Sequence, residues 1–280
     1  MDSVFEFFTG PLAHGFMLRA LLISVLIGSV CSIFSCFLVL KGWSLMGDAV
    51  SHAVLPGLAL AFILGIPLAV GAFAAGLFCA VTVGYIKDNS RVKEDAVMGI
   101  VFSGMFALGL VMLTKIETDV HLLHVLFGNV LGISQQDLIE AGIIAALCST
   151  IMLVKRKDLM LYCFDPAHAA VIGLPKKVLH FGLLILLSLT IVSSLKAAGI
   201  ILVIAMLIAP GATGFLLSRS FDKMLIVAIA TSVFSCVIGT LLSYHLDVAT
   251  APLIVVIQSG LFLLALVFGG SLRTMKGAQS

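Results

Sequence analysis

Apolar stretches of about 20 residues follow one another along almost the whole of this 280-residue chain. A helix of about 20 residues crosses the hydrocarbon core of a bilayer, which is about 30 Å thick. Hydrophobic residues make up 61% of the chain and charged residues only 11%, whereas soluble domains carry about 25% charged residues. The sequence therefore predicts an all-α, polytopic integral membrane protein rather than a water-soluble domain.

We expect eight to nine transmembrane helices in a single domain that covers residues 1–280. The apolar stretches lie at residues 16–40, 45–64, 67–86, 96–114, 137–154, 178–195, 199–218, 224–245 and 249–269. The segment 119–137 is too short and interrupted for a further crossing, which favours a re-entrant or peripheral helix there.

Lysine and arginine concentrate in alternate connections between these stretches. The basic clusters lie at residues 87–95, 155–158, 175–177 and 219–223 and in the C-terminal tail. Because short cytoplasmic loops carry an excess of Lys and Arg, the N-terminus is predicted to lie outside and the C-terminus in the cytoplasm. Lys196 lies on the outer side in this scheme, against the rule.

Asp48 and His52 interrupt the second apolar stretch, in the sequence GDAVSHAVLPG. Residues four apart share one face of a helix. Ionisable residues inside a membrane span typically face a cavity or a pathway, because exposing them to lipid is costly. Pro56 has no N–H to donate to the carbonyl of His52, which leaves that oxygen free for a ligand or water. A carboxylate, an imidazole and a carbonyl oxygen are therefore predicted to converge.

This donor set favours a divalent metal ion as the ligand. Carboxylate oxygen suits Mn(II) and Fe(II), and imidazole suits the later first-row metals, including Zn(II). Two ligands per chain would release an ion readily, as a transit site must, and a two-fold assembly would double the set. The competing interpretation is that Asp48 caps its helix while His52 lies in the interfacial region.

A second Pro-Gly pair, Pro210-Gly211, repeats the pattern of Pro56-Gly57 inside another apolar stretch. Interrupted helices in separate parts of a transporter point to its binding site. We therefore expect Pro210-Gly211 to shape the wall opposite Asp48 and His52. Chance repetition is the alternative, because Gly and Pro are frequent in membrane helices.

Two further pairs are candidate metal ligands on the outer side: His121 with His124, and His245 with Asp247. Each has a structural alternative, a polar surface for the first pair and a solvated helix end for the second. The nucleotide-binding motif G-x-x-x-x-G-K-[ST] is absent, as are H-E-x-x-H and G-x-S-x-G. The chain is therefore predicted not to be an enzyme. A metal-dependent intramembrane enzyme and an ion-coupled carrier or passive channel are the competing functional classes.

The sequence LVLKGWSLMGDAVSHAVLPG (38–57) resembles the signature of the membrane permeases of manganese/zinc/chelated-iron ABC transporters, and most resembles the chelated-iron/manganese branch. Further blocks agree with this family in the same order along most of the chain: KEDAVMGIVFSGMFALG (93–109), LFGNVLGIS (126–134), FDPAHAAVIGLP (164–175), AAGIILVIAMLIAPGATG (197–214) and LSYHLDVATAPLIVVIQ (242–258). Departures toward the outer face are Lys196, where the family has glutamine, and Ala249 and Ala251, where it has Pro and Gly.

The resemblance implies a type II-like importer permease in the bacterial cytoplasmic (inner) membrane. It implies as partners an identical or paralogous second permease protomer, cytoplasmic ABC ATPase subunits and an extracytoplasmic metal-binding protein. No nucleic-acid partner and no permanently bound cofactor are expected in the bilayer. The transported ion would be Mn(II) or Fe(II), with Zn(II) as the alternative.

The resemblance also assigns roles to residues. The aspartate and histidine that coordinate the cation in the family match Asp48 and His52. Within the cytoplasmic segment 158–177, the FDPAHAAVIGLP sequence matches the region that couples to the ATPase. The coupling residues expected there are Asp165, Pro166, His168, Gly173 and Pro175.

Overall fold

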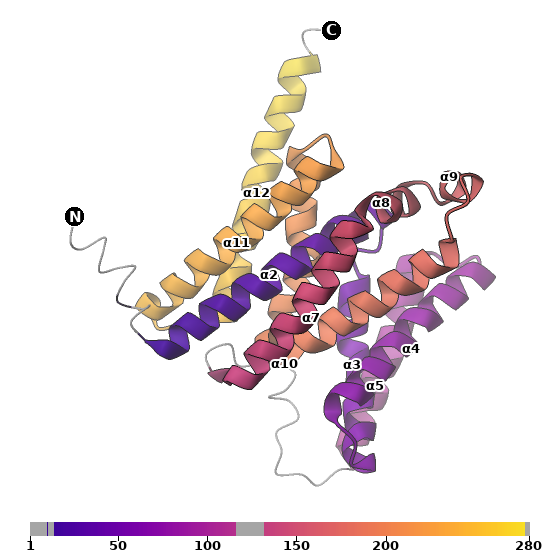
Figure 1. The fold of residues 1–280 in the computed structure, drawn as a ribbon, viewed down its shortest axis with the longest axis vertical. Helices are drawn as coiled ribbons and strands as arrows, with labels where there is room; N and C mark the ends of the chain where they lie inside the picture. The colour runs from indigo at the N-terminus through magenta and orange to yellow at the C-terminus, as the bar shows by residue number, and fades with distance from the viewer. Residues whose placement is uncertain (1–9, 11–13, 116–131, 278–280) are drawn as a thin grey trace.

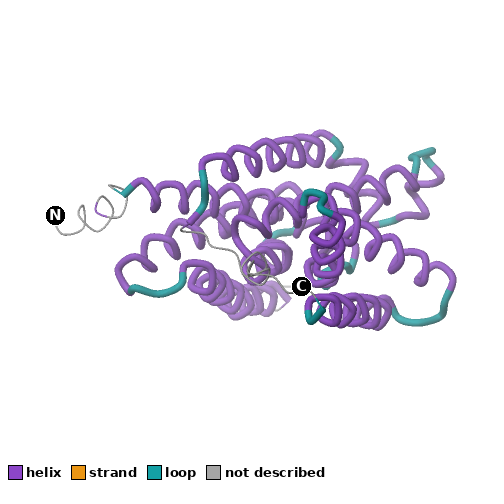
Figure 2. The backbone as a smooth tube through the Cα atoms, turned by 90° about the horizontal axis from the view of Figure 1, so that it is seen from below, coloured by secondary structure: helices purple, strands orange, loops and turns teal. Residues whose placement is uncertain are grey.

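The computed structural model describes residues 10, 14–115 and 132–277, and this part of the chain folds into helices without a strand (Figure 1). The helices are α2 (Gly15–Lys41), α3 (Met46–Leu64), α4 (Leu68–Asn89), α5 (Glu94–Leu113), α7 (Gln135–Val154), α8 (Arg156–Phe164), α9 (Pro166–Val171), α10 (Lys176–Leu217), α11 (Phe221–Leu246) and α12 (Thr250–Gly277). Short loops join most of them (Figure 2). The predicted all-α fold is confirmed.

Eight of these helices are long and apolar enough to cross a membrane. The longest, α10, contains 42 residues and includes Gly199, whose φ of 77° and ψ of 168° are not helical. In Figure 1 the chain reverses direction within α10, so this one element supplies two antiparallel crossings. The described helices therefore make nine crossings, because α10 counts twice. The predicted range of eight to nine matches the number of long helices and the number of crossings.

Ion pairs define the two ends of the bundle. Arg156 Nη1 lies 3.4 Å from Asp222 Oδ1, so the start of α8 and the start of α11 share one end. Lys196 Nζ lies 2.5 Å from Asp137 Oδ1 in the first turn of α7, which places the reversal of α10 at the opposite end. We call the end that carries Arg156 the basic end, because the connections rich in Lys and Arg return to it.

The helix α2 forms the centre of the bundle. Its buried side chains run along most of its length, and it packs against α7, α8, α10 and α11. Buried hydroxyl groups join the neighbouring helices: Ser24 Oγ lies 3.3 Å from Thr240 Oγ1, and Ser235 donates to Gln258 over 2.7 Å. Because a polar group in hydrocarbon must find a partner within the protein, these contacts fix how α2, α11 and α12 pack.

The predicted re-entrant segment 119–137 falls largely outside the described residues. The described structure resumes before α7, where Ser134 caps the helix by accepting a hydrogen bond from the Asp137 amide over 3.1 Å. Ser and Asp are favoured in this arrangement because they satisfy amides that the first helical turn leaves unpaired. The fifth predicted crossing therefore begins two residues earlier than expected.

Candidate functional site

Asp48 and His52 lie on one face of α3, within its first two turns. His52 Nε2 is 3.2 Å from Asp48 Oδ1, and the side chains are 28% and 29% exposed. At about 1.5 Å per residue, Asp48 lies about 3 Å and His52 about 9 Å from the start of the helix. The pair therefore lies near the basic end, and it is accessible although nearly all its neighbours on α3 are buried.

Two phenylalanines of α5 hold the ring of His52. Its centroid is 5.8 Å from that of Phe102, in a stacked arrangement, and 5.1 Å from that of Phe106, edge to face. His52 Nδ1 is buried and has no hydrogen-bond partner among the described residues. A buried polar atom without a partner is costly, by about 1–3 kcal/mol, so the packing against the two rings holds the imidazole in place against that cost.

The alternative in which Asp48 caps α3 does not fit this geometry. The N-cap position is Leu45, and no side chain caps the helix there. Asp48 lies inside the first turn and contacts His52 instead. Its carboxylate still interacts favourably with the positive end of the helix dipole, so the helix stabilises the negative charge without occupying both oxygens of the carboxylate.

Pro56-Gly57 lies one turn beyond His52, at a close contact of α3 with two neighbours. A Cβ on Gly57 would overlap the carbonyl oxygen of Gly71 on α4, and a Cβ on Gly71 would overlap the carbonyl of Gly57. On α5, a Cβ on Gly109 would come within 2.8 Å of Pro56 N. Small residues let membrane helices approach this closely, so both neighbours are held tightly at the break.

Pro210-Gly211 packs against α2. Ser35 Oγ of α2 donates to the carbonyl of Ile208 over 3.0 Å and accepts from the amide of Gly211 over 2.9 Å. Leu207, one turn earlier on α10, contacts Gly47 next to Asp48. The second half of α10 thus borders the candidate site through Leu207, whereas the Pro-Gly pair itself faces Ser35.

The other candidate ligands are not brought to this pair. His245 and Asp247 are exposed at the last turn and C-cap of α11, at the end of the bundle away from Arg156. His121 and His124 lie outside the described residues. Within the described ranges, no group of three or more His, Cys, Asp and Glu side chains could hold a metal ion. One chain therefore offers the Asp48–His52 pair rather than a complete metal cage.

The predicted coupling segment forms α8 and α9 at the basic end. Asp165 caps α9 by accepting from the amides of Ala167 and His168 over 3.0 and 2.9 Å, and Pro166 occupies the first turn. Gly173, with a φ of 81°, ends the element before Pro175. These caps at both ends fix the short helix α9, so its side chains keep a defined position at the basic end of the bundle.

The surface of this segment is apolar as well as exposed. Phe164, Val171 and Ile172 are 76%, 84% and 53% exposed. The segment therefore combines two features: Asp165, Pro166 and Gly173 shape α9, and the apolar side chains provide its outer surface.

Sequence reasoning missed Phe102, Phe106 and Ser35. The two phenylalanines are four residues apart on α5, so their shared face was readable, but the sequence does not say that this face meets His52. Ser35 is one of several serines in α2, and only the docking of α10 distinguishes it from the others.

Nine apolar crossings, an accessible Asp–His pair on α3 and an exposed short helix at the basic end together indicate a membrane transport protein. The chain belongs to the ABC 3 transport family, whose model matches residues 13–269. It is a transport permease of an ABC transporter and not an enzyme, as the sequence predicted.

Relatives within this family are close. The chain is 62% identical over 268 residues to the chelated iron transport system membrane protein YfeD of Yersinia pestis, covering 96% of this chain and 90% of YfeD. It is 55% identical over 257 residues to the manganese transport system membrane protein MntB of Synechocystis sp., covering 92% and 84%. The structure of PsaBC from Streptococcus pneumoniae in complex with Fab matches with a TM-score of 0.83 at 35% identity, covering 94% of this chain and 95% of that chain.

Proposed function

We propose that this chain is the permease subunit of an importer that carries Mn(II) or Fe(II) across the bacterial cytoplasmic membrane, with Asp48 and His52 as transient ligands. The observation that carries the proposal is the pair itself, a carboxylate and an imidazole 3.2 Å apart on one accessible face of α3. The names of YfeD and MntB, which refer to chelated iron and manganese, support the choice of ion.

The number of ligands supports transit rather than storage. Mn(II) and Fe(II) accept carboxylate and imidazole ligands, and one chain supplies one of each. Water or a second permease protomer, identical or paralogous, would complete the coordination of the ion. A site of this kind binds weakly enough to release its ion, which conduction requires.

The orientation follows from charge. With the basic end in the cytoplasm, α8 and α9 face the ATPase subunits, and Phe164, Val171 and Ile172 provide an apolar docking surface. The outer end then receives the ion from an extracytoplasmic binding protein. In this arrangement Asp48 and His52 lie nearer the cytoplasmic exit than the entrance.

Alanine substitution of the pair tests the proposal. D48A and H52A should each abolish uptake of radioactive manganese by cells that carry the complete transporter, while the permease stays in the membrane in normal amounts. H245A is the matched control, because it removes an exposed histidine at the other end of the bundle, and it should transport normally. Normal uptake by both D48A and H52A would refute the assignment, and loss of uptake in H245A alone would move the site to the outer mouth.

Competition identifies the ion and the energy source. In proteoliposomes with the ATPase and the binding protein, unlabelled Mn(II) and Fe(II) should compete with manganese uptake more strongly than Zn(II). Stronger competition by Zn(II) would favour the zinc alternative, because the same two ligands serve it. Uptake without ATP would instead indicate a carrier or a channel.

A further inference from the structure

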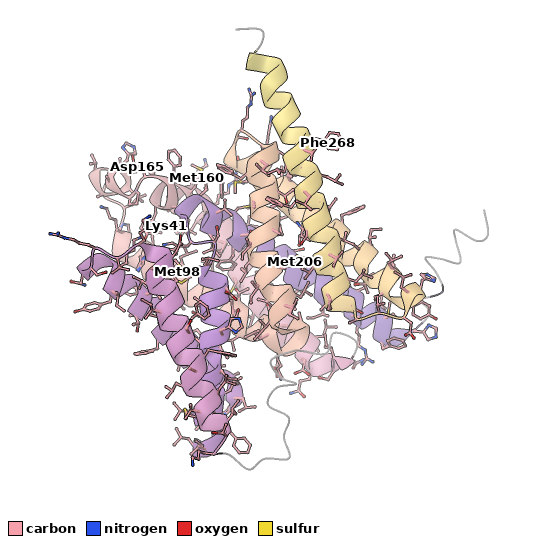
Figure 3. The ribbon with its side chains drawn as sticks, turned by 180° about the vertical axis from the view of Figure 1, so that it is seen from behind. Lys41, Met98, Met160, Asp165, Met206 and Phe268 are labelled. Atoms are coloured by element: carbon pink, nitrogen blue, oxygen red, sulfur yellow. The ribbon has the colours of Figure 1, made fainter. Side chains whose placement is uncertain are left out.

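A cavity of about 590 Å³ opens at the basic end, between the ends of α2, α4, α8 and α10. Four lysines line it, Lys41, Lys87, Lys176 and Lys177, together with the aromatic rings of Trp43 and Tyr162. Figure 3 shows Lys41 at the end of the bundle that also carries Met160 and Asp165. The cavity is separate from the Asp48–His52 pair, whose residues do not line its described wall.

Trp43 provides the first sign of a ligand. This residue follows Gly42 in the turn between α2 and α3, where its amide donates to the carbonyl of Leu38 over 2.8 Å. The side chain is 1% exposed, and its indole Nε1 has no hydrogen-bond partner among the described residues. Because a buried indole N–H usually finds an acceptor, Trp43 brings to the wall of the cavity a donor whose acceptor is not among the described residues.

Two of the four lysines, Lys41 and Lys87, lie against the aromatic rings. Lys41 Nζ lies 4.2 Å from the ring centroid of Tyr162 and 5.6 Å from that of Trp43, and Lys87 Nζ lies 5.7 Å from that of Trp43. Tyr162 in turn is fixed by a contact of 2.9 Å between its hydroxyl and His180 Nδ1. The cavity thus presents ammonium groups on a rigid aromatic frame, which suits a compact anion with several oxygens.

The rim of the cavity is apolar and faces outward. Val81 and Tyr85 of α4 and Phe181 of α10 line the cavity and are also 37%, 69% and 44% exposed. A free anion, or a carboxylate on a docking protein, has no hydrocarbon part to pack against this apolar rim. A molecule with a charged head and a hydrocarbon chain would occupy both parts.

We propose that this cavity binds the phosphate group of an anionic membrane phospholipid, with its acyl chains lying along Val81, Tyr85 and Phe181. The indole of Trp43 donates to a phosphate oxygen, and the lysines supply the positive charge. Basic pockets between transmembrane helices on the cytoplasmic side are suited to such headgroups. The bound lipid would join the turn that leads into Asp48 to the start of α10, just after the coupling segment.

Trp43 is also the means of testing the site, because it is the only tryptophan in the chain. The full-length permease is placed in nanodiscs of zwitterionic phosphatidylcholine, and brominated lipid, which quenches indole fluorescence on contact, is added in increasing proportion. Brominated phosphatidylglycerol should half-quench Trp43 at a mole fraction at least about tenfold lower than brominated phosphatidylcholine, since two nearby lysines at about fivefold each already exceed that factor. Equal quenching by the two lipids would refute the proposal.

Paired substitutions locate the effect. K176Q/K177Q should remove most of the preference for phosphatidylglycerol. R219Q/K223Q is the matched control, because it also removes two exposed positive charges at the basic end, and neither residue lines the described wall of the cavity. This control should keep the preference. A preference that survives K176Q/K177Q, or that both pairs reduce equally, would mean general attraction to the membrane surface and would overturn the assignment.

Two further arms distinguish other sources of the same chemistry. Inorganic phosphate, added to nanodiscs of phosphatidylcholine alone, should leave the Trp43 emission unchanged. A phosphate-induced shift of the wild-type size would make a free anion the ligand and refute the lipid. Addition of the ATPase subunit should leave quenching by brominated phosphatidylglycerol intact, and loss of that quenching would identify the cavity as a protein-docking site instead.

Discussion

The two Pro-Gly breaks look alike in sequence but are accommodated differently. At Pro210-Gly211 the side chain of Ser35 joins the carbonyl of Ile208 to the amide of Gly211, so a neighbouring helix satisfies the backbone there. At Pro56-Gly57 the neighbours approach through glycines, and no described side chain makes an equivalent bridge. The half-exposed Asp48 and His52 lie next to this second kind of break.

The difference shows that a proline in a membrane helix has two possible uses. Where another helix supplies hydrogen bonds, the break becomes a fixed packing point. Where close packing holds the helix but leaves a polar face accessible, the break can adjoin a ligand pathway. The Pro-Gly sequence alone does not distinguish these two uses of a proline. The neighbouring helices that contact the break do distinguish them.

The largest expected effect is at the packed break. G57A places a methyl group against the Gly71 carbonyl, and neither backbone can move away easily, so overpacking should cost about 3 kcal/mol. The apparent melting temperature of the purified permease should fall sharply. G104A on α5, where a Cβ meets no atom within 4 Å, is the control and should melt as the wild type does. A stable G57A protein would show that α3 and α4 can move apart at Gly57 and Gly71.

Removing the bridge at the other break should cost less. S35A leaves the Gly211 amide and the Ile208 carbonyl without their partner, which is worth about 1–3 kcal/mol. S51A, close to Pro56, removes only a hydrogen bond of 2.7 Å to Gly47 in its own helix, and it should change the melting temperature less. Equal losses in S35A and S51A would erase the proposed difference between the breaks.

A smaller effect is expected from the contact between Phe106 and His52. F106L removes the edge-to-face contact with His52 but keeps an apolar side chain, and such aromatic contacts are worth about 0.5–1.5 kcal/mol. The KM for manganese uptake should rise about two- to tenfold, with the amount of folded protein unchanged. A normal KM would show that His52 does not depend on Phe106 for its position.

The smallest effect concerns the end of the bundle opposite the basic end. Lys196 Nζ contacts Asp137 at 2.5 Å and Glu140 at 3.8 Å, but its side chain is 58% exposed. Exposed ion pairs contribute about 0–1 kcal/mol, so K196Q should lower the melting temperature only slightly and transport should persist. Complete loss of transport in K196Q would show that the reversal of α10 takes part in gating. The transport pathway would then depend on this reversal as well as on the two Pro-Gly breaks.

Much of the fold was predictable because bilayer thickness fixes helix length. The stretches 178–195 and 199–218 were separated in the sequence by Lys196, and the structure keeps them in one element that reverses at Gly199. Hydropathy gave the number of crossings, whereas the joining geometry depends on a backbone conformation that the apolar pattern does not report.

Less of the site was predictable. The spacing of Asp48 and His52 placed them on one face, which the structure confirms. The packing of His52 against Phe102 and Phe106 depends on how α5 is rotated against α3, and this follows from glycine contacts such as that of Gly109 with Pro56. The lysine cavity was missed because helices distant in sequence assemble it around Trp43.

The reversal at Gly199 also bears on how the chain enters the membrane. Lys196 is the only Asp, Glu, Lys or Arg between residues 178 and 218, and the two halves of α10 share no polar loop. Insertion of this part as one helical hairpin therefore requires a single ammonium group near the tip to cross the bilayer. Asp137 and Glu140 then receive it on the far side, so the ion pair marks the point at which the hairpin has passed fully through.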